Sequence, residues 1–531
     1  RAPAYPLVTI DPYTSAWSAT DNLYDSSVRH WTGKDFPLLG VVKVDGQTYR
    51  FMGTEELELR PLVKTSEQGS WRGKYTTQQP ADGWQNVGFD DKAWKEGEAA
   101  FGTMENEYTA KTQWGEEFIW VRRVADIPED LTGKNVYLEF SHDDDAIIYV
   151  NGIKVVDTGN SCKKNEKVKL PEEVVASLKQ GENLIAGYCH NRVGNGLLDF
   201  GLLVELEGYC SFLQTAQQTS VDVQPMQTYY TFTCGPVDLK LTFTAPMFMD
   251  NLDLLSRPVN YISYEVTSND SQKHQVELYF EAAPQWALDQ PHQESVADSF
   301  IDGNLLFLRT GSRNQEILKK KGDDVRIDWG YFYLAAEKEN STCAIGDGRE
   351  LRKSFLADKL EASTTNGYDK LALVRSLGET QKADGHLLIG YDDIYSIQYF
   401  GDNLRPYWNR QGNETIVSQF RKAEKEYDMQ MKNCAAFDKK LMAEATAAGG
   451  RKYAELCALA YRQALAAHKL VQAPNGDLVF LSKENFSNGS IGTVDLTYPG
   501  APLLLYYNPE LVKATMNHIF YYSESGKWTK P

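Results

Sequence analysis

The sequence lacks the cysteine patterns that would assign it to a class of protein at once. Its seven cysteines are odd in number and dispersed, and no C-x-x-C pair occurs among them. Neither a disulfide framework nor a zinc site is therefore indicated, and we expect mostly buried free thiols. The cysteines are Cys162, Cys189, Cys210, Cys234, Cys343, Cys434 and Cys457.

Long apolar runs and basic stripes are also missing. No apolar run approaches the roughly 20 residues that a membrane span needs, so we expect no membrane insertion. Lys and Arg number 55 against 73 Asp and Glu, which gives a net charge of −18. Because phosphate binding needs clustered cations, we expect no nucleic-acid partner.

Familiar catalytic motifs are absent as well. There is no G-x-S-x-G, no H-E-x-x-H and no G-x-x-x-x-G-K phosphate loop. Asp143, Asp144 and Asp145 are adjacent in a predicted strand and so alternate between its faces, unlike a D-x-D-x-D-G calcium loop. We therefore expect neither a metal nor a cofactor.

What the chain does have is length and many aromatic rings. Its 531 residues suggest roughly three or four domains, because one hydrophobic core does not grow that large. Aromatic residues make up 12%, which suits the half-buried strands of β-sandwich cores. Exposed rings that stack on a carbohydrate or another small polar ligand would give the same composition, and both interpretations stay open.

The first half of the chain is predicted to be β structure. Residues 1–70 mix turns with short strands around the hairpin signal Asp45-Gly46, and we expect them to be an N-terminal docking segment. Residues 71–207 contain short alternating runs separated by turns such as Asn151-Gly152, a spacing typical of a sandwich or jelly roll.

Residues 208–412 continue the β pattern over about 200 residues, which predicts one large sandwich. A polar and aromatic segment, 400–410, closes this region as a predicted loop. The strands expected here are 229–233, 239–244, 261–267, 275–280, 305–309, 329–335 and 386–395.

From about Thr415 the hydrophobic period changes from two to 3.6, which predicts helices over residues 413–531. Asn508 as N-cap and Pro509 at the first helical position announce the third of them. Three helices cannot close a domain of this kind, so we expect a helical linker and a partial domain that further chain completes. The expected buried faces are Phe420, Ala423, Tyr427 and Met431 on the first helix, then Tyr453, Leu456, Ala460, Ala464, Ala467 and Val471 on the second.

The most informative segment is 484–499 (ENFSNGSIGTVDLTYP). It combines carboxylates, carboxamides, glycines and an aromatic ring between two helical patterns. We expect irregular backbone here, which is where binding and catalytic residues tend to lie.

Three blocks of sequence resemble the glutaminase A-like family. The first is 11–18 (DPYTSAWS) with Asp21 and 30–33 (HWTG), the second is 492–499 (GTVDLTYP) with 507–511 (YNPEL), and the third is 328–331 (DWGY). The resemblance implies a β-supersandwich joined to the N-terminal part of an α/α toroid. It also implies a hydrolase that acts on the side-chain amide of glutamine.

A separate resemblance covers only residues 71–207. Gly83-Trp84, 89–94 (FDDKAW), 149–152 (YVNG) and 181–186 (GENLIA) are similar to galactose-binding-like jelly rolls. Such modules accompany many glycoside hydrolases, so this likeness informs fold more than chemistry. The expected fold class is thus multidomain and mainly β, with an inserted jelly roll.

Hydrolysis of an amide or glycoside without a metal or a Ser/Cys nucleophile needs paired carboxylates. Asp495 is the first candidate for a catalytic carboxylate, and Glu484 is the second. The alternatives are a turn or helix cap for Asp495 and a solvated surface for Glu484. Asn485 and Tyr498 would donate hydrogen bonds to a carboxamide or a sugar hydroxyl.

Further candidate substrate-binding residues lie outside this segment. Asp21, His30 and Trp31 form a polar and aromatic group that either lines the pocket of the helical domain or makes an interface with a satisfied histidine. Arg405 and Trp408 lie on a predicted sandwich loop and would wall the same cleft, since pockets often form between domains.

Together these features favour a secreted or periplasmic glutaminase-like amidohydrolase that binds a small amide. The alternatives are a glycoside hydrolase with the same layout and a glycan-binding protein. The N-terminal Arg1 without an initiator Met fits a mature or trimmed start whose export signal has been removed. The expected partners are the small-molecule amide or carbohydrate and the missing C-terminal part of the chain's own helical domain.

Overall fold

The structure is a computed structural model that describes residues 2–57, 59–103, 110–206, 210–212, 214–290, 293–320, 325–363, 367–483 and 491–529. The chain forms two compact units. One consists of Arg1–Glu56 and Cys210–Pro531, and the other of Leu57–Tyr209. Among the described residues, no helix has the length and apolar character needed to cross a membrane.

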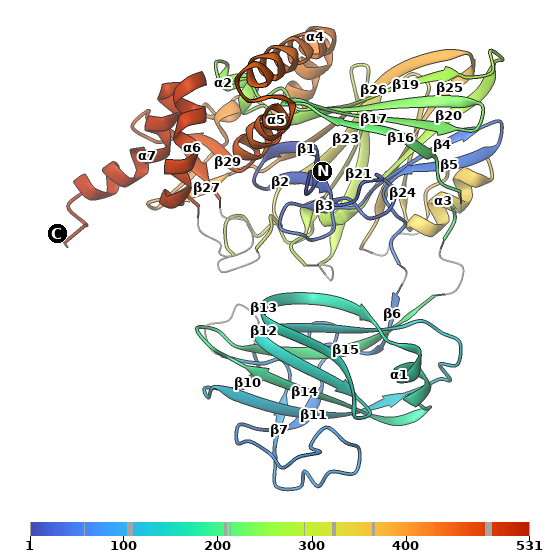
Figure 1. Ribbon diagram of the computed structural model, residues 1–531, viewed down its shortest axis with the longest axis vertical. Helices are drawn as coiled ribbons and strands as arrows, with labels where there is room; N and C mark the ends of the chain where they lie inside the picture. Colours follow the sequence, from blue (N-terminus) through green and yellow to red (C-terminus); the bar gives the residue numbers. More distant parts are fainter. Residues whose placement is uncertain are drawn as a thin grey trace. The chain divides into compact units, whose positions relative to one another are not determined.

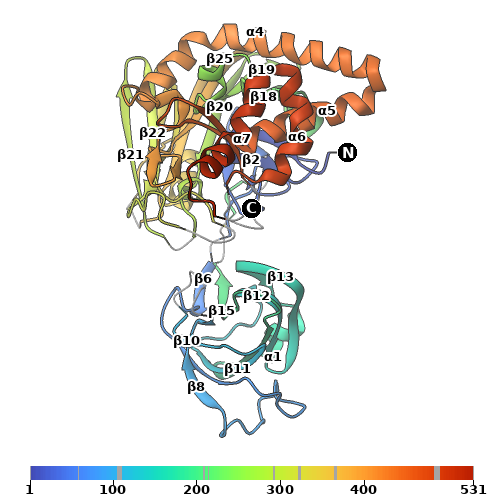
Figure 2. The same ribbon diagram turned by 90° about the vertical axis from the view of Figure 1, so that its left-hand side faces the viewer.

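The Leu57–Tyr209 unit is one sheet, antiparallel except for the short parallel pair β9–β10, that curls towards a barrel around its own core (Figure 2). Its order is β10-β9-β15-β12-β14-β11-β7-β8, with β13 paired to β12 and β6 to β15. Asn151 and Gly152, both with positive φ, turn β12 into β13 as the sequence predicts. The elements are β6 (Leu59–Val63), β7 (Arg72–Thr76), β8 (Lys95–Glu98), β9 (Phe101–Gly102), β10 (Thr112–Gln113), β11 (Phe118–Ile127), β12 (Val136–Val150), β13 (Ile153–Lys169), α1 (Glu172–Ser177), β14 (Gly181–His190) and β15 (Leu197–Glu205).

The other unit contains two large antiparallel sheets that share one hydrophobic core (Figure 1). Leu241 and Ile262 of the eight-stranded sheet and Val42 and Leu278 of the five-stranded sheet belong to that core. The eight-stranded sheet runs β16 (Gln217–Val223), β17 (Gln227–Cys234), β18 (Val237–Thr244), β19 (Val259–Ser268), β26 (Lys382–Asp392), β23 (Tyr331–Glu337), β22 (Leu305–Ser312) and β21 (Ser295–Asp302). The five-stranded sheet runs β24 (Ser341–Gly346), β25 (Lys370–Thr380), β20 (His274–Ala282), β4 (Leu38–Val44) and β5 (Gln47–Met52).

Smaller elements connect the sheets to the helices. The N-terminal residues form a three-stranded sheet, and two hairpins, β27–β28 and β29–β30, border the helical end. The strands are β1 (Tyr5–Asp11), β2 (Thr14–Ser18), β3 (Arg29–His30), β27 (Ile397–Tyr399), β28 (Asp402–Leu404), β29 (His468–Gln472) and β30 (Leu478–Ser482). The short helices are α2 (Leu252–Leu255), η1 (Pro284–Ala287), α3 (Gly348–Leu356) and η2 (Tyr407–Asn409).

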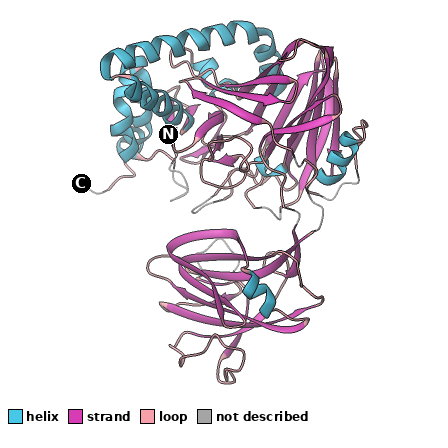
Figure 3. Cartoon of the chain, turned by 45° about the vertical axis from the view of Figure 1, so that its right-hand side comes forward, coloured by secondary structure: helices cyan, strands magenta, loops and turns pink. Residues whose placement is uncertain are grey.

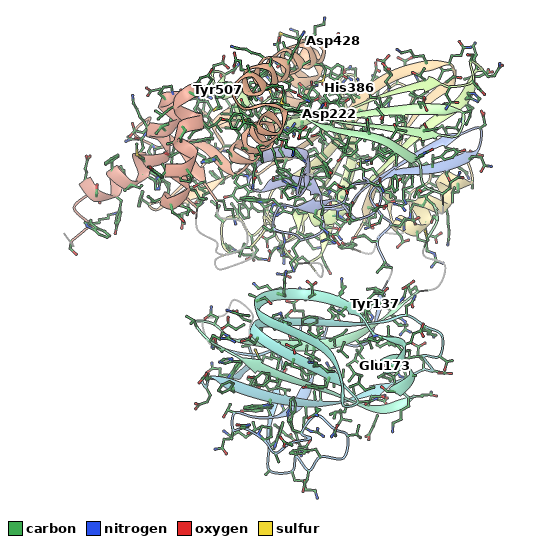
Figure 4. The ribbon with its side chains drawn as sticks, in the orientation of Figure 1. Tyr137, Glu173, Asp222, His386, Asp428 and Tyr507 are labelled. Carbon is green, nitrogen blue, oxygen red and sulfur yellow. The ribbon has the colours of Figure 1, made fainter. Side chains whose placement is uncertain are left out.

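The long helices gather at one end of the sheets (Figure 3). They are α4 (Ile416–Gly449), α5 (Arg451–Ala466), α6 (Val494–Tyr507) and α7 (Pro509–Glu524). The predicted start and buried stripe of α4 are confirmed, since Thr415 caps it and Phe420 and Ala423 are fully buried. His386 of β26 (Figure 4) stacks on Tyr427 at 3.7 Å and so helps to fix α4 on the sheet.

The predicted face of the second helix is wrong. Tyr453 and Leu456, which were expected to be buried, are 49% and 65% exposed. The helix ends at Ala466, so Val471, expected on its buried face, lies in β29 instead. Apolar residues surround α5 on nearly every side, so their period does not select a face. The buried residues include Ala458 and Arg462, whose guanidinium donates to the Pro225 carbonyl at 2.8 Å.

The expectation of irregular backbone up to residue 499 is also wrong. Helix α6 begins at Val494 and continues through Pro499 and Pro502. Each proline removes one backbone hydrogen bond, which is why the sequence disfavoured a helix here. The predicted start of α7 is confirmed, because Asn508 caps it by accepting from the Glu510 amide and Pro509 is its first residue.

Candidate functional site

A buried lysine joins three distant segments of the larger unit. Lys469 of β29 is 5% exposed, and its Nζ lies 2.5 Å from Asp11 Oδ2 and 2.7 Å from Asp393 Oδ2. Asp11 ends β1, and Asp393 follows β26. Because both carboxylates neutralise one buried cation, the N-terminal sheet, the sandwich and the β29–β30 hairpin are held at one junction.

Aromatic contacts at this junction bring the first and third family-like blocks together. The Tyr13 ring meets the Trp329 ring edge to face at 5.7 Å, and Tyr13 Oη donates to the Ser396 carbonyl at 2.7 Å. The Trp329 Nε1–H donates to the carbonyls of Asp393 at 2.8 Å and Tyr395 at 3.0 Å. Segments more than 300 residues apart in sequence therefore form one packed wall.

His30 and Trp31 converge on one backbone carbonyl. His30 Nε2 lies 3.1 Å and Trp31 Nε1 3.0 Å from the Pro12 carbonyl oxygen, while His30 Nδ1 lies 2.8 Å from Thr32 Oγ1. Burial, helped by the charges of Arg326 and Lys483, holds the pKa of His30 well below its usual value. His30 is therefore neutral at pH 7, with both ring nitrogens engaged within the protein.

The second family-like block begins beside the end of the β29–β30 hairpin, since the Gly492 amide donates to the Ser482 carbonyl at 2.7 Å. Lys483 follows the last residue of β30, is 7% exposed and directly precedes segment 484–490. Its amide donates to the Ala467 carbonyl at 2.9 Å, which sets Lys483 across the hairpin from the start of β29. The candidate residues Glu484 and Asn485 themselves lie outside the described residues.

Two buried carboxylates near Arg326 were not identified from sequence. Lys320 Nζ lies 2.6 Å from Asp289 Oδ2 and 3.0 Å from Asp328 Oδ2. Burial raises the pKa of Asp328, whereas Arg326 and Lys320 outweigh burial at Asp289 and hold its pKa below the usual value. Carboxylates whose pKa values are pushed apart are typical of acid/base pairs. Their wide sequence spacing carries no signal, although Asp328 begins the DWGY block.

The other candidates have more open surroundings. Asp495 lies in the exposed first turn of α6, and Tyr498 is 88% exposed. Asp21 is exposed and accepts a hydrogen bond from Tyr5 Oη at 2.7 Å. Among the described residues, no group of three His, Cys, Asp or Glu side chains could hold a metal ion.

Arg405 and Trp408 border two neighbouring hollows. A hollow of about 240 Å³ is lined by Trp408 and Arg257, among others, and a more open one of about 430 Å³ by Arg405 and Tyr395. Arg410 borders both, so the 405–410 segment forms the partition between them. The second hollow adjoins the junction, because the Tyr395 carbonyl accepts from Trp329.

Family comparisons cover most of the chain in order. Residues 1–64 and 226–444 match two families described as domains of unknown function, DUF4964 and DUF5127. Residues 450–531 match the glutaminase A six helical-hairpin domain.

Two curated fungal proteins are similar over part of the chain. Glutaminase A of Aspergillus oryzae is 25% identical over 59% of this chain and 47% of its own length. A probable glutaminase of Arthroderma benhamiae is 21% identical over 55% of this chain and 36% of its own. The chain thus spans less than half the length of the curated relatives it matches.

Solved structures give only weak overall likeness. A β-glucuronidase of an uncultured Clostridium species has a TM-score of 0.21 at 9% identity, covering 43% of each chain. A β-glucuronidase of Faecalibacterium prausnitzii has a TM-score of 0.23 at 13% identity, covering 48% of each chain. Scores this low carry no argument about function. The three family matches, together with the distant similarity to glutaminase A, show that the chain belongs to the glutaminase A-like family.

Proposed function

We propose that this chain forms part of a glutaminase-like amidohydrolase that releases ammonia from glutamine or a related small amide. The observation that carries the proposal is the convergence of the family-like blocks around Lys469 and the β29–β30 hairpin. The match to the glutaminase A helical-hairpin domain supports the same activity. Residues that act in one functional site are expected to lie close together in the fold, even when they are far apart in the sequence.

The proposed chemistry is general acid and base catalysis by carboxylates, one protonating the leaving amine and one activating water. Asp495 and Glu484 remain the proposed catalytic pair. Asn485, Tyr498 and Asp21, together with the junction residues His30 and Trp31, are proposed to bind the amide substrate. Arg405 and Trp408 are proposed to bind it from the sandwich side.

We further propose that the larger unit combines a β-supersandwich with the first helices of an α/α toroid. Large apolar side chains are exposed on α6 and α7, including Leu505 at 55% and Phe520 at 55%. Exposed apolar surface of this kind marks a face that another element covers. Further helices of the same domain are the proposed partner, and the Leu57–Tyr209 unit is proposed to be a galactose-binding-like jelly roll. A secreted or periplasmic location is proposed for the protein.

The test is ammonia release from L-glutamine by the full gene product, with a panel of small amides and aryl-glycosides alongside. We expect turnover of glutamine and its loss in Asp495→Asn, because the amide lacks acid/base capacity. Glu510→Gln is the matched control, since Glu510 is an exposed first-turn carboxylate of α7 paired with Lys513. No ammonia from any amide would end the proposal, and turnover of glycosides instead would replace it.

A further inference from the structure

The hollow of about 430 Å³ beside the junction is cationic in an acidic protein. Arg405 and Arg410 line it, together with the polar side chains of Tyr395, Asn403 and Gln472. No Asp or Glu lines it among the described residues. The whole chain carries a net charge of −18, so a hollow of this composition is unlike the general surface.

The two arginines of the hollow differ in their pairing. Arg410 Nη1 donates to Asp253 Oδ1 at 2.7 Å and is neutralised there. Arg405 has no ion pair with any described carboxylate; its Nη2 reaches only Tyr395 Oη, at 3.5 Å. A guanidinium presents five N–H donors, so most of the hydrogen-bonding capacity of Arg405 is free for a ligand.

The Arg405 guanidinium is held in place by its neighbours. It lies over the Tyr395 ring, 4.9 Å from the ring centroid. On another side it packs against Gly412, where an added Cβ would come within 3.3 Å of Arg405 Nε. Stacking and close packing reduce the side-chain freedom that ligand binding would otherwise have to remove.

Asp392 is one carboxylate whose charge interacts with Arg405. Burial raises the pKa of Asp392 to about 6, and the charges of Lys469 and Arg405 act in the opposite direction. Asp392 makes no ion pair with Arg405 among the described contacts, so it leaves the donors of Arg405 unoccupied.

We propose that Arg405 binds the carboxylate of a small ligand in this hollow. The proposed ligand is a free amino acid, bound through its α-carboxylate. A guanidinium and a carboxylate match in shape and charge and form two parallel hydrogen bonds. The choice of an amino acid rests on the proposed amidohydrolase function, whereas the recognition of a carboxylate rests on the hollow alone.

The experiment measures L-glutamate binding by calorimetry, which requires no turnover. We expect Arg405→Gln to weaken binding about 10- to 100-fold, the usual effect of removing a hydrogen bond to a charged group. Arg405→Lys keeps the positive charge but cannot form the two parallel hydrogen bonds of a guanidinium, so we expect an intermediate loss of L-glutamate affinity. Arg421→Gln is the matched control, because Arg421 is an exposed arginine of α4 paired with Asp302. Melting temperatures of all variants check that they fold.

The outcomes separate this inference from the proposed function. If Arg405→Gln loses L-glutamate binding while the wild type releases no ammonia, the hollow binds carboxylates and the proposed function fails. If ammonia is released but the glutamate affinity and the KM for glutamine are unchanged in Arg405→Gln, the inference is overturned alone. Absence of glutamate binding by the wild type, or equal binding of neutral acetamide, also overturns it.

Discussion

Replacing Lys469 with methionine tests whether the junction is held by its buried charge. The Lys469 side chain is 6% exposed and contacts Asp11 and Asp393, which are 12% and 3% exposed. Methionine has a side chain of about the same length as lysine, but it leaves two buried carboxylates without their cation. Removing one partner of a buried ion pair typically costs about 3–5 kcal/mol.

An exposed ion pair, Lys513 with Glu510, serves as the control for the effect of burial. Lys513 and Glu510 approach to 2.7 Å, as closely as Lys469 and Asp393, but their side chains are 65% and 61% exposed. Exposed pairs contribute about 0–1 kcal/mol, so Lys513→Met should be nearly neutral. Burial, and not contact distance, is therefore the variable under test.

Urea-dependent hydrogen exchange read by mass spectrometry suits the measurement because it gives the free energy of opening for each segment. We expect the loss in Lys469→Met to appear in β1, β29 and the segment after β26. Segments of the Leu57–Tyr209 unit, which has a core of its own, serve as the internal reference. The loss should shrink in the double variant with Asp393→Asn, which removes one of the two unpaired buried carboxylates. A loss below about 1 kcal/mol at pH 7.5 would refute the reasoning, since buried pairs cost more than that to break.

Three further substitutions give sharp expectations. Gly330→Ala should destabilise the sandwich by at least about 2 kcal/mol, because Gly330 has φ +76° and an added Cβ would lie 2.0 Å from the Asp392 carbonyl; thermal unfolding checks this. Burial raises the pKa of Asp438 to about 7, above its unfolded value, so stability is lost as pH rises from about 4 through 7. Asp438→Asn should remove that part of the pH dependence in urea titrations, and an unchanged slope would contradict it. Asn508→Ala should cost about 1 kcal/mol, seen as faster amide exchange at the start of α7, because Asn508 caps that helix and also donates to the Met249 carbonyl. Unchanged exchange there would show that the cap is dispensable.

Local signals in the sequence predicted the elements that local physics controls. The turns at Asp45-Gly46 and Asn151-Gly152 have positive φ at both residues, as two-residue hairpin turns require. The long stripe of α4 and the Asn508 cap of α7 follow from helix period and capping chemistry in the same way. These features need only a few neighbouring residues.

Features that depend on distant partners were missed. The buried face of α5 is chosen by its neighbours and includes Arg462, a residue that no apolar pattern would select. Helix α6 forms in spite of Pro499 and Pro502, with Leu504 as its one buried residue among those described. Asp289 and Asp328 become a candidate pair only because Lys320 lies between them.

The sequence by itself determined the family-like blocks, the mainly β composition and the change to helices near Thr415, since these depend on residue identity and short-range period. Only the tertiary structure decided that the blocks meet at Lys469, that His30 is neutral and enclosed, and that Arg405 faces a hollow without a carboxylate partner. The physical reason is that pairing, burial and charge compensation are properties of contacts between segments hundreds of residues apart.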